Sequence, residues 1–282
     1  MPPPRVGFIG LGSLGKPMAI KVREAGFDLT VYDIKAESLD DLLKLGAKQA
    51  ATPADLGRAC DIIEIMVSNG AQVEDVISSP HGILAGARAG LIAVIHSTVG
   101  PDVCRRMAAL TKTKNVHVLD AGVSGGVPAA QAGALSLMVG GEAEILEKCR
   151  PVFAAFANMI HFIGEIGSGQ IAKILNNHAV YCNILTLNEV LHLAQQAGVA
   201  VDIMLKVLNS SSGRSFSSET WDYFRPYRQN YPTGVEGWSA MVDKDISLAL
   251  DIAKQHGVPS PVIALASQYV SRGLGFDSIT HI

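Results

Sequence analysis

A glycine-rich turn near the amino terminus constrains the fold of this chain more than any other feature. The run FIGLGSLGKPMA places glycines in the spacing GxGxxG, directly after the apolar run RVGFI and before a predicted helix from Lys16 to Ala25. In such a turn the first glycine permits a tight bend, the second lets the backbone approach a pyrophosphate, and the third allows close packing of helix on strand. The amides and positive dipole at the helix start attract phosphates. A dinucleotide is therefore predicted to bind at Gly10, Leu11, Gly12, Ser13, Leu14 and Gly15.

An acidic residue ends the second predicted strand, DLTVYD. Asp33 follows the glycine turn at a distance where its carboxylate can accept hydrogen bonds from the adenine-ribose hydroxyls. A 2′-phosphate would meet like charge there, so the predicted cofactor is NAD rather than NADP. Lys35, two residues further on, would partly offset that repulsion. The alternative interpretation is a glycine turn followed by a solvent-exposed aspartate.

Short apolar runs alternate with helix-like segments through the first half of the chain. The predicted strands after the first two are DIIEIMV, GLIAVIH, NVHVLDA, LSLMVGG and NMIHFIG. This alternation indicates a mostly parallel, doubly wound sheet of the Rossmann type, covered by helices on both faces. No strand is expected after Phe162, and one long helical stretch is expected from Gly167 to Gln196. We predict an α/β dinucleotide-binding domain over residues 1–164 and an all-helical substrate and dimerisation domain over residues 165–282.

The composition excludes several function classes. Hydrophobic residues make up 48% of the chain and charged residues 17%, which is typical of a compact enzyme, and the net charge of −3 offers no basic field for nucleic acid or a membrane surface. No signal peptide or membrane span is expected. The four cysteines form no CxxC pair and accompany no histidine at metal-ligand spacing. We expect a cytoplasmic protein with reduced thiols and no metal.

The long helix carries a lysine and an asparagine on a face that should be covered. Gly169, Lys173 and Asn177 are four residues apart and therefore share a helix face. Glycine at 169 leaves room for another element or a ligand. The nearby helix amino terminus and partial burial both favour the neutral amine, so the pKa of Lys173 should fall towards the range of a general acid and base. Asn177 could hold the lysine or a substrate oxygen. The alternative is a lysine that reaches water and an asparagine packed between helices.

Two further stretches supply groups suited to an anionic substrate. DAGVSGG, residues 120–126, comes at the carboxyl end of a predicted strand, where open α/β sheets bind ligands. Its Ser124, Gly125 and Gly126 offer a hydroxyl and unhindered backbone amides to a carboxylate. DKDISLAL adds Lys244, a second cation that could reach the ligand, and Asp245, which could orient it. The alternative for Lys244 is an ordinary exposed helix charge.

Four stretches, in this order, resemble the motifs of the β-hydroxyacid dehydrogenase family, whose members include 3-hydroxyisobutyrate dehydrogenases and tartronate semialdehyde reductases. They are GLGSLGKPMA, DAGVSGG, GSGQIAKILNN and KDISLAL, and the likeness extends to the carboxy-terminal GLGFDSITHI. The resemblance implies NAD-dependent interconversion of a small 3-hydroxy acid and its aldehyde or keto acid, in a homodimer or homotetramer. Rival hypotheses are a non-catalytic NAD-binding sensor and an imine reductase, and imine-reducing relatives typically lack the lysine that is present here.

The resemblance also implies roles for individual residues. Lys173 would be the catalytic acid and base, and Asn177 would position the substrate. Ser124, Gly125 and Gly126 would grip the substrate carboxylate, and Lys244 would reach the nicotinamide end of the site. Val67 and Ser68 would border the cofactor, Thr98 would lie beside the nicotinamide ribose, and Asp245 would join the cofactor-binding group.

Three positions depart from the commonest family pattern. Ser68 stands where proline is usual, His96 where an acidic residue often precedes the Ser-Thr pair, and Gly122 where the family motif has proline. None removes a catalytic group. All three are expected near cofactor or substrate, so they bear on which acid is used.

Overall fold

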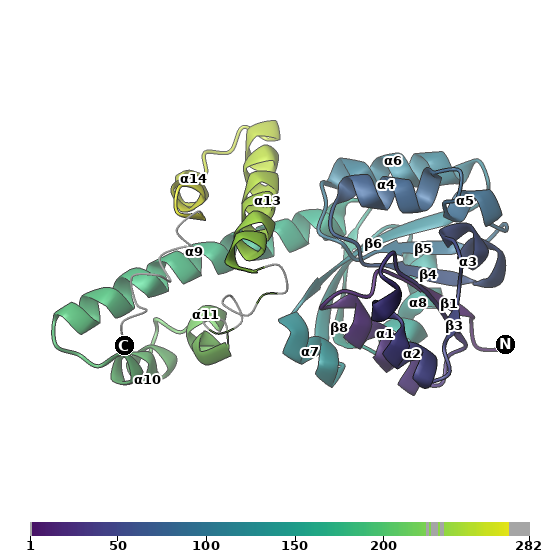
Figure 1. Ribbon diagram of the computed structural model, residues 1–282. Coiled ribbons are helices and arrows are strands. Elements are labelled where there is room, and N and C mark those ends of the chain that lie inside the picture. The colour runs from purple at the N-terminus through teal and green to yellow at the C-terminus, as the bar shows by residue number, and fades with distance from the viewer. Residues whose placement is uncertain (1, 224–225, 227–230, 232–233, 271–282) are drawn as a thin grey trace. The chain divides into compact units, whose positions relative to one another are not determined.

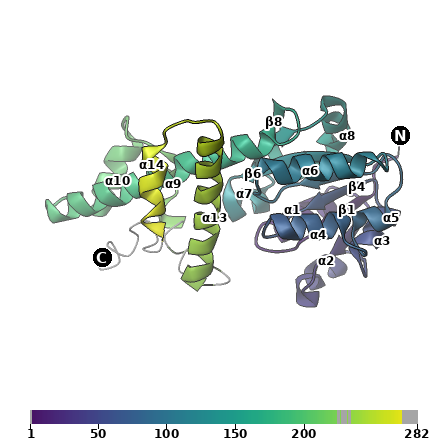
Figure 2. The same cartoon turned by 90° about the horizontal axis from the view of Figure 1, so that it is seen from above.

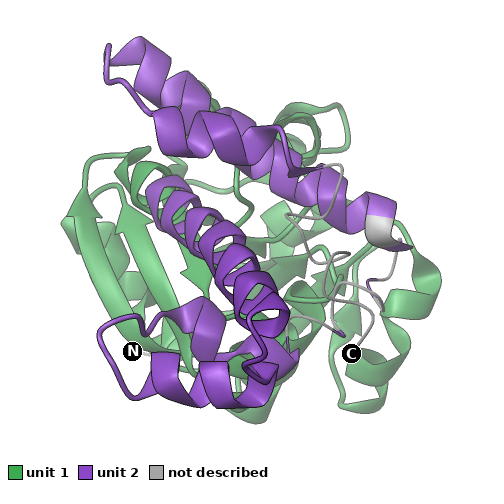
Figure 3. Cartoon of the chain, turned by 90° about the vertical axis from the view of Figure 1, so that its left-hand side faces the viewer, with its two compact units in different colours: residues 1–173 green, residues 174–282 purple. Residues whose placement is uncertain are grey.

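The computed structural model describes residues 2–223, 226, 231 and 234–270. The chain divides into two compact units, residues 1–173 and residues 174–282 (Figure 3). The division falls inside one long helix, and the boundary expected near Gly164 stays a prediction. The family-like ending at residues 273–282 lies outside the described residues.

The first unit is built on one eight-stranded sheet with the strand order β3-β2-β1-β4-β5-β6-β7-β8 (Figure 1). Neighbouring strands are parallel, except that β6 and β7 are antiparallel. The first six strands have the order of a Rossmann fold, which confirms the predicted fold class. The strands are β1 Val6–Ile9, β2 Leu29–Tyr32, β3 Lys48–Gln49, β4 Ile62–Ile65, β5 Ile92–Ile95, β6 His117–Ser124, β7 Leu135–Gly140 and β8 Ala157–Gly164.

Helices cover both faces of this sheet, and each face has its own hydrophobic core. One core packs α1 (Gly15–Glu24), α2 (Asp40–Lys44), α7 (Gly126–Ala132) and α8 (Ala143–Phe153) against the strands. The other packs α3 (Pro53–Ala59), α4 (Gly70–Ser78), α5 (Ile83–Gly86) and α6 (Pro101–Lys112). A short 3₁₀ helix, η1, spans Ala36–Ser38. The central strands β1, β4 and β5 are buried along their whole length, which explains why they appear as continuous apolar runs.

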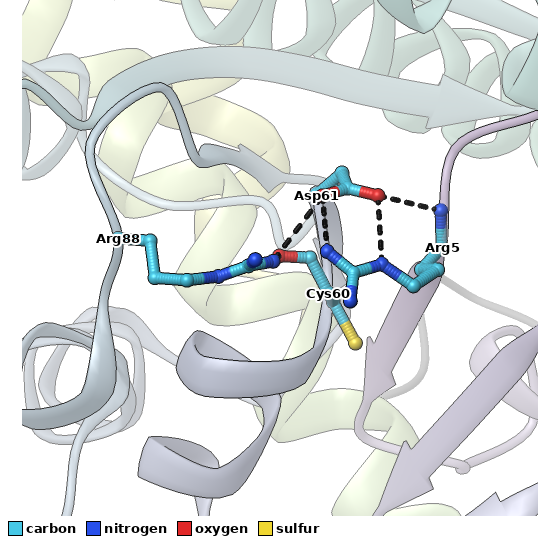
Figure 4. A network of polar contacts seen from close by, with 4 residues as sticks. All are labelled: Arg5, Cys60, Asp61 and Arg88. Carbon is cyan, nitrogen blue, oxygen red and sulfur yellow. Dashed lines mark hydrogen bonds and ion pairs between the residues drawn. The ribbon is translucent and has the colours of Figure 1, made fainter. Parts of the chain in front are cut away.

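A surface network joins the starts of β1 and β4, just outside the parallel pairing of Val6 with Ile62 (Figure 4). The guanidinium of Arg5 donates to both carboxylate oxygens of Asp61, at 3.1 and 2.7 Å, and the Arg5 backbone N–H donates to the same carboxylate at 2.9 Å. Arg88 donates to Asp61 as well. These hydrogen bonds hold the pKa of Asp61 below its usual range.

Every regular element described in the second unit is a helix, as predicted. Its helices are the main part of α9 (Ser168–Gln196), α10 (Val201–Asn209), α11 (Phe216–Glu219), α13 (Gly234–Gln255) and α14 (Pro261–Ser267). Helices α13 and α14 pack side by side (Figure 2). Across the described part of the chain, no helix is both long and apolar enough to cross a membrane.

Candidate active site

The glycine turn after β1 has the geometry that a dinucleotide requires. Gly10 adopts a φ of +90°, and a Cβ there would overlap the carbonyl oxygen of Met66. A Cβ on Gly15 would overlap the carbonyl oxygen of Gly10, because α1 starts directly against the turn. At Gly12, by contrast, a Cβ would meet no atom within 4 Å. The turn is therefore tightly packed on the protein side and open at Gly12, where a pyrophosphate would approach.

The start of α1 and the end of β2 complete the fit to a dinucleotide. No side chain caps α1 at its N-cap residue Leu14, and its first turn holds no acidic residue, so the positive end of the helix stays available to phosphates. Asp33 is half-buried, and its carboxylate accepts the backbone N–H of Leu11 at 2.6 Å and of Lys35 at 2.8 Å. These two bonds fix Asp33 beside the glycine turn.

The loops after β4 and β5 are tied together at the carboxyl edge of the sheet. The backbone N–H of Val67 donates to the Ser97 hydroxyl at 2.8 Å, so Val67 lies next to the segment that carries half-buried Thr98. Ser68 is exposed. Val99, the residue after Thr98, donates its backbone N–H to the side-chain oxygen of buried Gln170 in α9 at 3.1 Å. Gln170 thus links this edge to α9, a contact that the sequence analysis missed.

The DAGVSGG motif lies mostly inside β6 rather than after it. Strand β6 continues to Ser124 because its second half pairs with antiparallel β7, a pairing that the sequence did not predict. Gly125 and Gly126 then turn the chain into α7 with φ values of +124° and +71°, which residues other than glycine rarely adopt. Ser124, Gly125 and Gly126 therefore lie together at the carboxyl end of β6.

Asp120 in β6 holds the start of α9. Its side chain is fully buried, and its two oxygens accept the backbone N–H groups of Gly167 and Gln170, both at 2.6 Å. A carboxylate at the amino end of a helix is favoured by charge-assisted hydrogen bonds and by the helix dipole. Burial nevertheless raises the pKa of Asp120 above its usual value, and the two amide bonds offset part of that rise.

Lys173 lies in α9, three residues after Gln170, and is 8% exposed. Its Cβ and Cγ lie over Gly122 of β6, where an added Cβ would be only 2.6 and 2.8 Å from them. The room that the sequence analysis expected at Gly169 is filled by another element, since a Cβ there would overlap the carbonyl oxygen of Met138 in β7. The predicted burial of the lysine is therefore present in the structure.

A second buried network lies between α9 and α13. Asp245 is 4% exposed and accepts hydrogen bonds from the Asn177 amide at 2.7 Å and the Tyr181 hydroxyl at 2.9 Å. Its other oxygen accepts from Lys244 at 2.8 Å. Burial and the neighbouring Asp245 raise the pKa of Tyr181 well above its usual value. The structure thus brings Asn177, Lys244 and Asp245 together, with Tyr181 as a member that the sequence analysis missed.

His96 and Glu64 form a fully buried pair beside β6. The Nε2 of His96 lies 2.6 Å from a Glu64 carboxylate oxygen, and its Nδ1 lies 2.7 Å from the carbonyl oxygen of Ala121. Because a carbonyl only accepts hydrogen bonds, Nδ1 is the donor in that contact. Phe153 and Phe156 contact the imidazole edge-to-face. His96 therefore holds the β6 backbone between Asp120 and Gly122.

No cluster of histidine, cysteine, aspartate or glutamate suited to a metal ion occurs among residues 2–223, 226, 231 and 234–270. The groups brought together in each unit are amides, hydroxyls, carboxylates and lysines. Such groups bind anions and transfer protons.

Comparison with known proteins extends over both units. Residues 5–164 match the NAD-binding domain of 6-phosphogluconate dehydrogenase, and residues 167–275 match the NAD-binding domain of NADP-dependent 3-hydroxyisobutyrate dehydrogenase. The chain is 34% identical to a 2-(hydroxymethyl)glutarate dehydrogenase of Eubacterium barkeri, covering 95% of this chain and 89% of that protein. It is 32% identical to an NAD-dependent L-serine dehydrogenase of Pseudomonas aeruginosa, covering 93% and 89%. Among solved structures, a 3-hydroxyisobutyrate dehydrogenase of Salmonella typhimurium has a TM-score of 0.82 at 28% identity, covering 95% of this chain and 93% of that one.

Proposed function

This chain belongs to the β-hydroxyacid dehydrogenase family and is an NAD(P)-dependent hydroxyacid dehydrogenase; on that premise we propose that Lys173 is its general acid and base. The observation that carries the proposal is the burial of Lys173 in the first turns of a helix whose start is fixed by Asp120. A lysine is seldom buried, and burial shifts the balance of its two protonation states towards the neutral amine that a general base requires. Here it lies over the strand that ends at Ser124 and is followed by Gly125 and Gly126, the groups suited to a substrate carboxylate.

The substrate class follows from the chemistry that similar proteins share. The names of the relatives above contain three substrates: 3-hydroxyisobutyrate, L-serine and 2-(hydroxymethyl)glutarate. In each of them a CH₂OH group is attached to the carbon that carries a carboxylate. We propose that this chain oxidises a 3-hydroxypropanoate of that type with a substituent at carbon 2. Ser124 and the backbone amides of Gly125 and Gly126 would bind the shared carboxylate.

In the proposed reaction the alcohol loses a hydride from carbon 3 and a proton from oxygen, which yields the aldehyde. The nicotinamide ring, when bound, supplies the hydride acceptor. The neutral amine of Lys173 accepts the hydroxyl proton, and in the reverse direction its ammonium returns the proton to the carbonyl oxygen. Asn177 is proposed to position the substrate, and Asp245 fixes the Asn177 amide for that purpose. Lys244 is proposed as a further cation for substrate or cofactor.

The cofactor is proposed to be NAD, bound along the glycine turn from Gly10 to Gly15 and by Asp33. The fixed position of the Asp33 carboxylate beside that turn supports this preference. Val67, Ser68 and Thr98 are proposed to border the nicotinamide half. We further propose that the chain assembles at least as a dimer, because α9 has 29 residues, far more than the average of about 11 for a helix.

The test is the variant Lys173→Ala, assayed with NAD and a panel of 3-hydroxyisobutyrate, L-serine and 2-(hydroxymethyl)glutarate. On the best substrate kcat should fall by about 100-fold or more, the usual size of an acid–base contribution. Lys173→Arg should fail as well, because a guanidinium keeps its proton near neutral pH. Asn177→Ala should cost less. NAD binding should barely change, since no phosphate contact is lost. Near-normal turnover by Lys173→Ala would refute the proposal and make Lys244 the next residue to test.

A further inference from the structure

The stem of Lys173 occupies the place where a side chain at residue 122 would otherwise lie. A Cβ at Gly122 would be 2.6 Å from the Lys173 Cβ, 2.8 Å from its Cγ and 3.6 Å from its Cδ. The two closest atoms are the ones nearest the helix backbone, so rotation of the outer bonds of the lysine would not relieve the overlap. Gly122 therefore determines how closely α9 and its lysine approach β6.

Asp120 fixes the same helix along its axis. Asp120 and Gly122 are two residues apart in a strand and therefore share one face of the sheet. The carboxylate of Asp120 accepts the Gly167 and Gln170 amides at the start of α9, and Lys173 follows less than one helical turn later. The contact with Asp120 thus sets the start of the helix, and the contact with Gly122 sets its distance from the strand.

Two more glycines are needed for this close approach. A Cβ at Gly140 of β7 would lie 2.6 Å from Asp120 Oδ1, and a Cβ at Gly169 of α9 would lie 2.7 Å from Asp120 Oδ2. The Asp120 carboxylate is therefore enclosed by the backbone of β7 and α9, and a side chain at residue 140 or 169 would overlap it.

We infer that Asp120 and Gly122 are positioning residues for the reaction, acting through Lys173; this inference rests on the proposed catalytic role of that lysine. Any Cβ at position 122 would occupy the space that Lys173 fills here. Glycine at this position lets the lysine stem lie against the strand backbone. A side chain at residue 122 would therefore change the placement of the Lys173 amine rather than the set of groups that touch the substrate.

The first experiment replaces Gly122 with alanine in the full chain. The lysines are isotopically labelled at the ε-carbon and followed by NMR. The Lys173 resonance is the one that is missing from the spectrum of the Lys173→Ala variant. Displacement of the stem should move the pH midpoint of that resonance by about half a unit or more, because burial and neighbouring charges set such midpoints. In steady-state assays kcat should fall about tenfold or more, while the KM for NAD stays within about twofold, since the lost contribution concerns proton transfer alone.

A matched control separates this effect from general crowding. Gly7 lies in β1 of the same sheet, and a Cβ there would be 2.6 Å from Leu56 Cδ2, the same distance as in the test variant. Gly7→Ala should lose thermal stability, yet leave the Lys173 midpoint and kcat unchanged. If Gly122→Ala behaves like Gly7→Ala while Lys173→Ala is inactive, the proposed function stands and the positioning role is overturned.

Asp120→Asn provides a second test that keeps the size of the side chain. An amide nitrogen cannot accept a hydrogen bond, so one of the two α9 amides loses its acceptor. We expect the same loss of kcat with an unchanged KM for NAD, and this variant decides the question if Gly122→Ala does not fold. Wild-type kcat and an unmoved Lys173 midpoint in Asp120→Asn would overturn the inference. If Lys173→Ala itself keeps turnover, the proposed function and the inference fail together.

Discussion

Replacement of His96 by leucine should be strongly destabilising, although His96 is not proposed to touch the substrate. Both members of the Glu64–His96 pair are fully buried, and their polar atoms are 2.6 Å apart. The other carboxylate oxygen of Glu64 already lacks a hydrogen-bond partner within the described residues. Removal of His96 would leave the whole carboxyl group unpaired in a hydrophobic core. Breaking a buried pair in this way costs about 3–5 kcal/mol.

The reciprocal variant, Glu64→Leu, should cost less. His96 keeps its hydrogen bond to the carbonyl of Ala121, so only one ring nitrogen loses its partner. An unsatisfied buried polar group of that kind costs about 1–3 kcal/mol. In the double variant Glu64→Leu/His96→Leu only the Ala121 carbonyl loses a partner. The double variant should therefore be at least about 2 kcal/mol more stable than the sum of the single effects predicts.

Thermal unfolding of the purified variants measures these differences. For domains of about 150–250 residues each kcal/mol shifts the midpoint by about 2–4 °C, so His96→Leu should melt about 6–20 °C below wild type. The exposed pair of Arg5 and Asp61 offers a control, because both side chains are 44% exposed (Figure 4). Asp61→Asn should cost less than about 1 kcal/mol. Additive effects in the double variant, or a His96→Leu loss as small as that of Asp61→Asn, would refute the reasoning.

Three further predictions follow from the cofactor site, the long helix and the buried thiols. With Asp33 fixed beside the glycine turn, NAD should be used at least about tenfold better than NADP in kcat/KM, or about 1.4 kcal/mol; equal efficiencies would instead assign Lys35 to the 2′-phosphate. Light scattering at micromolar concentration should give the mass of at least a dimer, and a monomeric mass would exclude the proposed assembly. Burial raises the pKa of Cys60 to about 11 and raises the pKa values of Cys104 and Cys149 well above the usual value for a thiol. Iodoacetamide should therefore label these three cysteines only after unfolding. Rapid labelling of the native protein would contradict their burial.

The local features of this fold could be predicted from the sequence, because their signals are local. The glycine spacing, the apolar strands and the long helix each depend on residues that are neighbours along the chain. Strand β3 was missed because Lys48 and Gln49 are both exposed and offer no apolar pattern. Strand β7 was predicted from the run LSLMVGG, but its antiparallel direction was not, since an apolar strand carries no signal of its direction.

The contacts that organise the site could not be predicted, since they join residues far apart in sequence. Asp120 binds amides 47 and 50 residues away, and Glu64 binds a histidine 32 residues away. Asp245 binds a tyrosine 64 residues away. Hydrophobic periodicity reports which residues are buried, but it does not report which polar groups meet inside the core. Gly122 was visible as a departure from the family pattern, yet its contact with Lys173 required the three-dimensional structure.

The pKa of Asp120 gives an independent reason to assign it a role in function. A carboxyl group whose folded-state pKa is raised contributes stability at low pH that is lost as the pH rises through that value. Ionisation of Asp120 in the folded protein therefore costs stability relative to its neutral form, even though the carboxylate accepts hydrogen bonds from two amides. Asp120→Asn removes this burial cost and loses one amide acceptor, so the two changes oppose each other and the melting temperature should move little. A carboxylate retained at a stability cost is typical of residues that serve activity. Loss of turnover without loss of stability in Asp120→Asn would thus separate positioning of Lys173 from simple support of the fold.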